Sequence, residues 1–326
     1  MNAEAQRKIA AILQVLDEAE RPLGSQKIAR ALQTLGFDLE ARMVRNYLNM
    51  MDAEGLTVNL GRGGRELTPR GRLELNDAGL MGRVGFIDAR SDELAFKMTL
   101  DLRRQRGTVI MNLSTLPAAY LGDAQRIMAG VIRAGLGMGR FGLIGRQAAE
   151  GVPGLSLAAG EAVIGTVCSI TVNGLLRAEG IPTISRFGGL LEIADKQPVR
   201  FTHVIRYDGT TLDPIEVFIK ASMTRVGEAA ATGNGIIGAS FREVPAVALP
   251  QVRKVFERMD EAGLGGLILV GDPSRPLCGV PVEHGRAGII IAAGLNPLAA
   301  VEEAGIPTTN RALARLCDFD RLVSLI

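Results

Sequence analysis

Two parts of this chain repeat one another. Gly107–Leu136 aligns without a gap to Gly235–Leu264, and each copy holds an amphipathic helix between a proline and a glycine. Gly180-Ile-Pro-Thr183 returns later as Gly305-Ile-Pro-Thr308. Each copy is roughly a hundred residues long, a period at which a duplication forms two halves packed as one body, because a solenoid needs several shorter repeats. We therefore expect one duplicated domain.

The chain has room for a further domain before this duplication. A length of 326 residues normally divides into about two domains. Forty glycines and few aromatic residues favour an α/β domain with tight ligand-binding loops. We predict an α/β protein: an N-terminal winged helix-turn-helix over residues 1–76, a linker at Asn76–Gly79, and a duplicated α/β domain over residues 80–326, with halves of about 83–195 and 203–326.

Composition excludes several classes of function. The first residues lack an apolar signal core, and the longest apolar runs are about half a membrane span, so we expect a cytoplasmic protein without a membrane partner. The three cysteines are scattered, and only His203 and His284 are present. The sequence therefore supports neither a disulfide framework nor a zinc site, and we expect no metal and no cofactor.

The first eighty residues have the pattern of a winged helix. Apolar stripes predict three helices, the third from about Glu40 to Glu54. Its core face carries Val44, Leu48 and Met51. A second face carries residues at i, i+3, i+4 and i+7, namely Arg42, Arg45, Asn46 and Asn49. This second face is suited to the major groove of double-stranded DNA.

A β-hairpin follows the third helix. Leu56–Leu60 and Arg65–Thr68 flank a basic glycine turn, and Arg62 and Arg65 are predicted to reach phosphate or the minor groove. Thr68-Pro69 then has the pattern of a helix start. An alternative is that these arginines form only a solvated face and that the winged helix docks another protein.

Polar residues cluster where two apolar runs of the duplicated domain end. The first cluster holds Cys168, Ser169, Thr171, Asn173 and Gly174, and the second holds Gly294 and Asn296. Hydroxyls, amides and backbone N–H groups at strand ends are typical of a small-anion site, and Arg186 could clamp a carboxylate. We predict that these residues line an effector cleft between the two halves.

Other sites are weaker hypotheses. Gly135–Gly142 resembles a dinucleotide fingerprint but follows a helix where a Rossmann loop follows a strand. Cys168 could be a nucleophile if His203 or His284 approached it, which keeps open an α/β enzyme acting on a small carboxylate. A free cysteine at the end of an apolar strand is more often a small buried hydrophobe. We therefore expect no catalytic residues.

The motifs together resemble a known family. A short winged helix of the kind found in ribonuclease R precedes Cys168–Gly174, Ser185-Arg-Phe-Gly-Gly-Leu190 and Gly294-Leu-Asn-Pro-Leu-Ala-Ala300. The whole chain is thereby similar to the NrpR family of nitrogen-regulatory repressors. The resemblance implies a homodimeric repressor of nitrogen-assimilation genes that releases its operator when 2-oxoglutarate binds the duplicated domain. We expect the operator to be an inverted repeat. A repressor that senses another metabolite remains an alternative.

Overall fold

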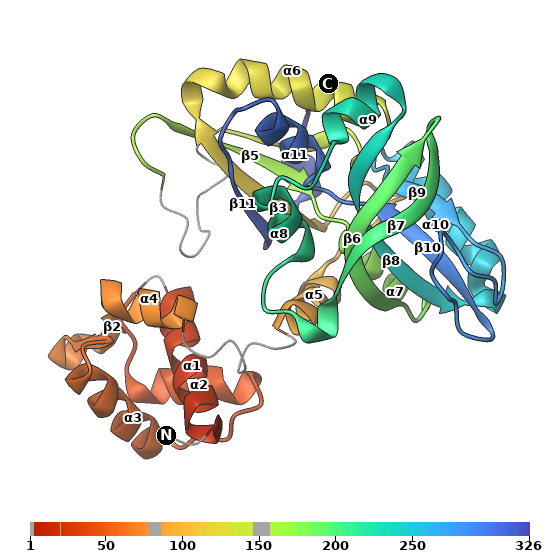
Figure 1. Cartoon of the computed structure of the whole chain (residues 1–326). Helices are drawn as coiled ribbons and strands as arrows, with labels where there is room; N and C mark the ends of the chain where they lie inside the picture. Colours follow the sequence, from red (N-terminus) through yellow and green to blue (C-terminus); the bar gives the residue numbers. More distant parts are fainter. Residues whose placement is uncertain (1–2, 20, 78–85, 146–156) are drawn as a thin grey trace. The chain divides into compact units, whose positions relative to one another are not determined.

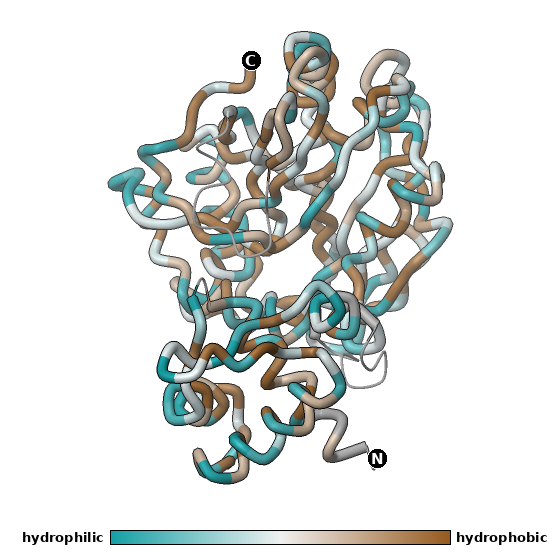
Figure 2. The backbone as a smooth tube through the Cα atoms, turned by 90° about the vertical axis from the view of Figure 1, so that its left-hand side faces the viewer, coloured by the Kyte–Doolittle hydropathy of each residue, from teal (hydrophilic) through white to brown (hydrophobic). Residues whose placement is uncertain are grey.

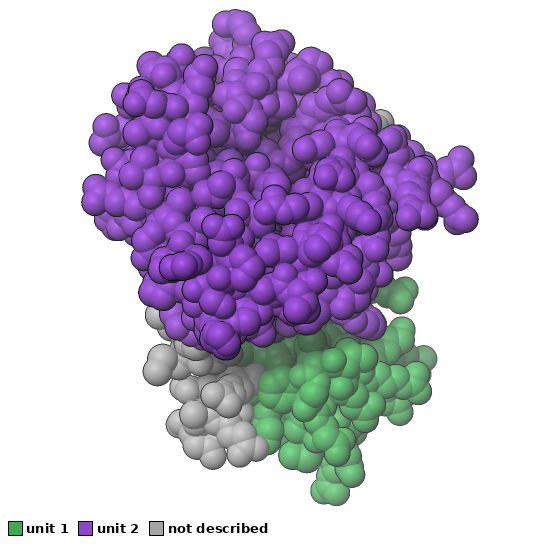
Figure 3. Space-filling model, turned by 90° about the vertical axis from the view of Figure 1, so that its right-hand side faces the viewer, with its two compact units in different colours: residues 1–84, 151–156 green, residues 85–150, 157–326 purple. Residues whose placement is uncertain are grey.

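The computed structural model describes residues 3–19, 21–77, 86–145 and 157–326. They form two compact units, residues 3–77 and residues 86–145 with 157–326 (Figure 3). The predicted α/β class, with a winged helix before a larger domain, is confirmed. The predicted linker was placed too early, because Asn76 and Asp77 still belong to a helix; residues 78–79 lie outside the described part.

The first unit is a winged helix. Its elements are α1 (Ala3–Glu18), α2 (Ser25–Thr34), α3 (Ala41–Ala53), β1 (Thr57–Asn59), β2 (Arg65–Leu67) and α4 (Pro69–Asp77). The two strands pair antiparallel, with a 3-10 turn at Gly61–Gly63 between them. The Thr68 hydroxyl accepts a hydrogen bond from the Gly71 N–H at 2.9 Å, so the predicted start of α4 is confirmed. One apolar core unites the helices and the wing.

The second unit contains two five-stranded antiparallel sheets. The order in the first sheet is β11 (Thr309–Asp318), β3 (Thr108–Pro117), β5 (Glu161–Val167), β4 (Phe141–Ile144) and β12 (Val323–Ser324). The order in the second is β7 (Gln197–Arg206), β6 (Ile184–Ala194), β8 (Gly235–Pro245), β10 (Arg286–Ala292) and β9 (Leu267–Val270).

Each sheet draws strands from both copies of the repeat. β6 follows the first copy but pairs with β8 of the second, from Ile184 opposite Glu243 to Ile193 opposite Gly235. β11 ends the second copy but pairs with β3 of the first. The two halves of the sequence are therefore not two halves in space, and the interior strands β3 and β8 each lie beside a strand from the other half.

Seven α-helices in the described part of this unit pack with the two sheets (Figure 1). They are α5 (Phe86–Lys97), α6 (Leu121–Arg133), α7 (Thr171–Ala178), α8 (Pro214–Lys220), α9 (Val226–Thr232), α10 (Leu249–Glu261) and α11 (Asn296–Glu303). α11 follows β10 of the second sheet, yet Leu298 and Val301 pack with Leu116 and Ile164 of the first. Figure 2 shows hydrophobic and hydrophilic stretches following one another along the backbone. The turns that precede α7 and α11 are buried in this unit.

Candidate functional site

The predicted DNA-reading face lies on α3 as expected. Val44, Leu48 and Met51 are completely buried, which orients the helix in its unit. The side chains on the other face, Arg42, Arg45, Asn46 and Asn49, are exposed. The helical spacing therefore predicted correctly which side chains of α3 are buried and which are exposed.

The two wing arginines have different surroundings. Arg62 is exposed in the turn at the tip of the wing. Arg65 is only 13% exposed, and its Nε donates to Asp52 Oδ2 at 2.8 Å. Its Nη2 donates to Asn49 Oδ1 at 2.7 Å. The Arg65 side chain is therefore bonded to α3, whereas the sequence predicted that it reaches phosphate or the minor groove.

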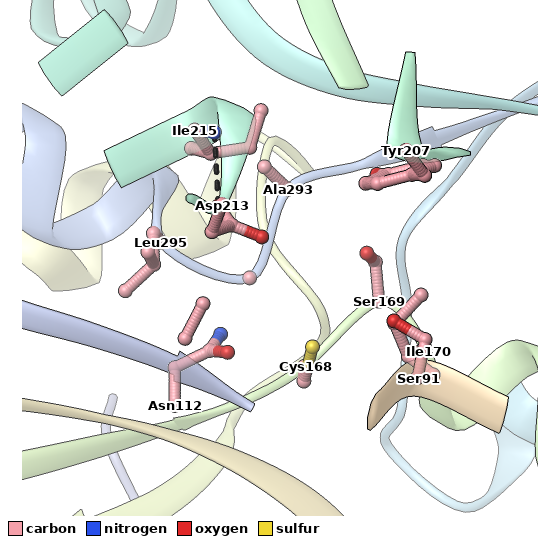
Figure 4. A pocket seen from close by; sticks show the side chains of 12 residues that line it. Ser91, Asn112, Cys168, Ser169, Ile170, Tyr207, Asp213, Ile215, Ala293 and Leu295 are labelled. Atoms are coloured by element: carbon pink, nitrogen blue, oxygen red, sulfur yellow. Dashed lines mark hydrogen bonds between the residues drawn. The ribbon is translucent and has the colours of Figure 1, made fainter. Parts of the chain in front are cut away.

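Two equivalent turns of the second unit meet at one cavity. Cys168–Ile170 joins β5 to α7, and Ala293–Leu295 joins β10 to α11. Both turns line a cavity of about 20 Å³, together with side chains from α5, β3 and the start of α8 (Figure 4). The remaining lining residues are Ser91, Asn112, Tyr207, Asp213, Ile215 and Ala312. This volume is enough for about one water molecule.

Four backbone N–H groups in these turns have no acceptor among the residues that the structure describes. They belong to Ser169, Ile170, Gly294 and Leu295. All four residues are buried. Unpaired buried donors are costly, and successive N–H groups at the start of a helix form an anion-binding concavity. The two turns therefore bring residues with such N–H groups from both halves to the wall of the same cavity.

Thr171 and Asn296 hold helices to strands. The Asn296 amide accepts from the Gly238 N–H at 2.9 Å and donates to the Gly238 C=O at 2.8 Å. Thr171 Oγ1 makes the equivalent pair of contacts with Ile110, which occupies the same repeat position as Gly238. Both side chains are completely buried, and neither lines the cavity. This geometry gives the two side chains a structural role, whereas the sequence predicted them to be effector ligands.

The residue that sequence reasoning missed is Arg242. It lies on the central strand β8, completely buried. Its Nε donates to Asn173 Oδ1 at 2.6 Å, its Nη1 to Ser240 Oγ at 2.6 Å, and its Nη2 to Ser169 O at 2.9 Å. No carboxylate in the described part of the chain forms an ion pair with it. The available signal was the pair of charged residues, Arg242 and Glu243, in a mainly apolar strand.

Arg242 carries a positive charge beside the cavity, and none of its hydrogen-bond partners within the described residues is a carboxylate. Burial lowers the pKa of its guanidinium, yet an arginine remains protonated in proteins. All its partners are neutral, and Ser169 is also part of the cavity wall. A buried cation without a counter-charge is unfavourable, so an entering anion would be stabilised there.

Arg186, the predicted carboxylate clamp, lies elsewhere. Its Nη1 donates to Glu283 Oε1 at 2.9 Å, and its Nε is 3.9 Å from Oε1 of the buried Glu243. It does not line the cavity. Asn173 bridges Arg242 to Ser185, and Gly174 packs closely against Met98. Of the predicted effector residues, only Cys168, Ser169 and Gly294 line the cavity.

Burial shifts the pKa values of the titratable groups at and near the cavity. Burial raises the pKa of the Cys168 thiol to about 12 and also raises the pKa of Tyr207. Burial raises the pKa of Asp213 to about 6, and burial with the Asp213 charge raises that of Glu216 to about 7. Asp213 Oδ1 accepts from the N–H groups of Ile215 and Glu216 and caps α8. A thiol with this pKa is not a nucleophile at neutral pH.

A winged helix joined to a duplicated domain, in which two equivalent turns line one cavity, is the architecture of a transcription regulator with a regulatory domain. Residues 84–324 match the NrpR regulatory domains NRD1 and 2, and residues 10–75 match the ribonuclease R winged-helix domain. The chain belongs to the NrpR family of nitrogen regulators, and the predicted resemblance is confirmed.

Individual relatives agree. The global nitrogen regulator NrpRI of Methanosarcina mazei is 33% identical over 99% of both chains. The global nitrogen regulator NrpR of Methanococcus maripaludis is 28% identical over 95% of this chain and 54% of its own length. The crystal structure of a nitrogen repressor-like protein from Methanococcus jannaschii superposes with a TM-score of 0.61 at 27% identity, covering 73% of this chain and 97% of that one.

Family membership decides against the enzyme alternative, since the relatives are named as regulators. His203 and His284 are both exposed and do not line the cavity with Cys168. Among the described helices, none is long and apolar enough to cross a membrane.

Proposed function

We propose that this protein is a DNA-binding repressor of nitrogen-assimilation genes whose effector is 2-oxoglutarate. The observation that supports the effector assignment is a cavity beside the buried Arg242, lined by four residues whose N–H groups have no acceptor within the described part of the chain. 2-Oxoglutarate brings two carboxylates and a keto oxygen, all acceptors. Donors from both turns and one guanidinium match that chemistry.

Effector binding requires the cavity to widen. A space of about 20 Å³ does not admit a five-carbon dicarboxylate. The ligand therefore stabilises a state in which the turns at Ser169 and Gly294 lie further apart. It shifts operator affinity by the ratio of its affinities for the two states. In a homodimer this movement changes operator binding, because the distance between the two winged helices decides whether both can contact an inverted repeat.

Isothermal titration calorimetry of the full chain tests the effector, with glutamate and oxaloacetate as controls. We expect saturable binding that is selective for 2-oxoglutarate, and a gel-shift titration in which the same ligand releases operator DNA. Selective binding of another metabolite would support the assignment as a repressor but identify a different effector. Binding of none of the three would overturn the effector assignment.

Substitution of Arg45 by alanine tests the DNA-reading face. Arg45 is exposed on α3, and a base-contacting arginine contributes about 1–3 kcal/mol of discrimination. We expect operator affinity to fall roughly 10- to 100-fold with 2-oxoglutarate binding unchanged. Arg133→Ala, which removes an exposed arginine from α6, is the matched control and should bind the operator like wild type. Equal affinity of Arg45→Ala and wild type would remove Arg45 from the interface.

Effector affinity should depend on pH. An anion in the cavity raises the pKa of Asp213 further above its value of about 6, so binding takes up a proton. Affinity should therefore be highest near pH 6 and fall toward pH 8, by up to about tenfold per pH unit for one linked proton. Cys168 and Tyr207 stay neutral throughout this window because burial raises both pKa values.

Calorimetry in buffers of different ionisation enthalpy measures this proton uptake directly. Asp213→Asn is the matched variant, since an amide oxygen can still accept the two N–H groups at the start of α8. Its affinity should depend less steeply on pH, with the remaining slope assigned to Glu216. An unchanged slope would show that Asp213 does not face the bound anion.

A further inference from the structure

A chain of side-chain hydrogen bonds connects the wing to the DNA-reading face of α3. The buried Thr57 donates from Oγ1 to Asp52 Oδ1 at 2.5 Å. Asp52 Oδ2 accepts from Arg65 Nε at 2.8 Å, and Arg65 Nη2 donates to Asn49 Oδ1 at 2.7 Å. The backbone of Arg65 is itself fixed, because its N–H and C=O both bond to Leu23 at 2.9 Å. Each member of this network therefore holds the next one in place.

We propose that Arg65 is a positioning residue that sets the base preference of Asn49. The inference rests on the proposed DNA-binding function and extends it. A free asparagine offers both an acceptor and a donor, and it pairs with adenine through N6 and N7. Arg65 donates to Oδ1, so Oδ1 lies toward the wing and Nδ2 lies away from it. Asn49 thereby becomes mainly a donor.

A fixed amide orientation has a consequence for recognition. Reversal of the Asn49 amide would place two N–H donors against the guanidinium, and Asp52 prevents Arg65 from turning away. A donor prefers base edges that present only acceptors. Guanine presents N7 and O6, whereas adenine presents one acceptor and one donor. Wild type should therefore prefer guanine over adenine at the base that Asn49 contacts.

The network also explains why Arg65 differs from Arg62. The exposed Arg62 has the position of a phosphate contact, whereas Arg65 is 13% exposed and its charge is balanced by Asp52. Removal of a phosphate contact lowers the affinity for all DNA sequences to the same extent, and it also reduces the salt dependence of binding. A positioning residue changes the preference at one base pair. The two roles are therefore separable by measurement.

The experiment selects operator sequences from a random DNA library with the full-length protein and measures affinity for single-base variants at several salt concentrations. Arg65→Lys keeps the charge but lacks the planar fork that holds Asp52 and Asn49 together. Asp52→Ala keeps Arg65 but releases its guanidinium. Both variants should shift the guanine-to-adenine preference at one position by roughly tenfold toward adenine, with the salt dependence unchanged. Arg62→Ala should lower affinity and salt dependence uniformly.

Asn49→Ala completes the test. It should remove the preference at that position, and adding Arg65→Lys to it should change the preference no further. A uniform loss of affinity with weaker salt dependence in Arg65→Lys would identify Arg65 as a phosphate contact and overturn the proposal. Unchanged base preference in both Arg65→Lys and Asp52→Ala would also overturn it. Failure of wild type to select any sequence would instead contradict DNA binding itself.

Discussion

Replacement of Arg242 by methionine is expected to weaken 2-oxoglutarate binding by roughly 30-fold or more. Removing one partner of a buried charged pair costs about 2–5 kcal/mol, and every 1.4 kcal/mol is a factor of ten in affinity. Arg242 is completely buried beside Ser169 of the cavity wall, and its partners in the free protein are neutral. A ligand carboxylate would be its first counter-charge. Calorimetry measures the loss directly.

The same variant should keep its fold and its operator affinity. Methionine fills a similar volume and removes a desolvated charge, which offsets part of the loss of three hydrogen bonds. Operator binding in the absence of ligand should equal that of wild type, and 2-oxoglutarate should no longer release the DNA. The variant would therefore be a permanent repressor.

Arg186→Met is the matched control, because Arg186 is paired with Glu283 and does not line the cavity. It should bind 2-oxoglutarate within a few-fold of wild type. If Arg186→Met abolished binding and Arg242→Met preserved it, the sequence hypothesis would be right and the structural assignment wrong. Loss of folding in Arg242→Met, detected by circular dichroism, would call for Arg242→Lys as the alternative variant.

Asn296→Ala is expected to destabilise the protein by roughly 3–5 kcal/mol. The amide makes three buried hydrogen bonds, two with Gly238 and one with the Leu136 C=O at 2.8 Å. Its removal leaves the Gly238 N–H and the Leu136 C=O without this partner, whereas the Gly238 C=O still accepts from the Ala293 N–H at 2.9 Å. Thr171→Val removes the equivalent contacts to Ile110, which are longer at 3.3 and 3.4 Å, and it preserves the volume. That variant should lose only about 1–2 kcal/mol.

Urea denaturation of the full chain, followed by far-UV circular dichroism, measures both free energies of unfolding. Equal losses in the two variants would contradict the ranking by hydrogen-bond geometry. Normal stability of Asn296→Ala with lost 2-oxoglutarate binding would instead make Asn296 an effector contact, as the sequence suggested.

Local patterns predicted the local structure well. Helical spacing separated the buried face of α3, with Val44 and Leu48, from the exposed face with Arg45 and Asn49, because both faces follow from one helical period. Thr68-Pro69 predicted the start of α4 for a similar reason, since a helix cap involves residues a few positions apart. The internal repeat correctly predicted that equivalent turns would recur before α7 and α11.

The candidate effector site was predicted only in part. Polar residues after an apolar run indicated that Ser169 and Gly294 would lie near one another, and both line the cavity. The pattern could not distinguish them from Thr171 and Asn296, whose side chains turn toward the backbone of strands β3 and β8. The reason is that the side chains of neighbouring residues point in different directions where a helix begins.

The sequence by itself determined the winged helix, the duplicated α/β domain and the family. Only the tertiary structure decided that β6 and β11 cross to the opposite sheet, and that Arg242 reaches Ser169, separated from it by 73 residues. The physical reason is that a strand's alternating pattern specifies which face is buried but carries no information about the neighbouring strand. Arg65 illustrates the same limit, because its basic side chain fitted a phosphate contact until the fold placed Asp52 and Asn49 beside it.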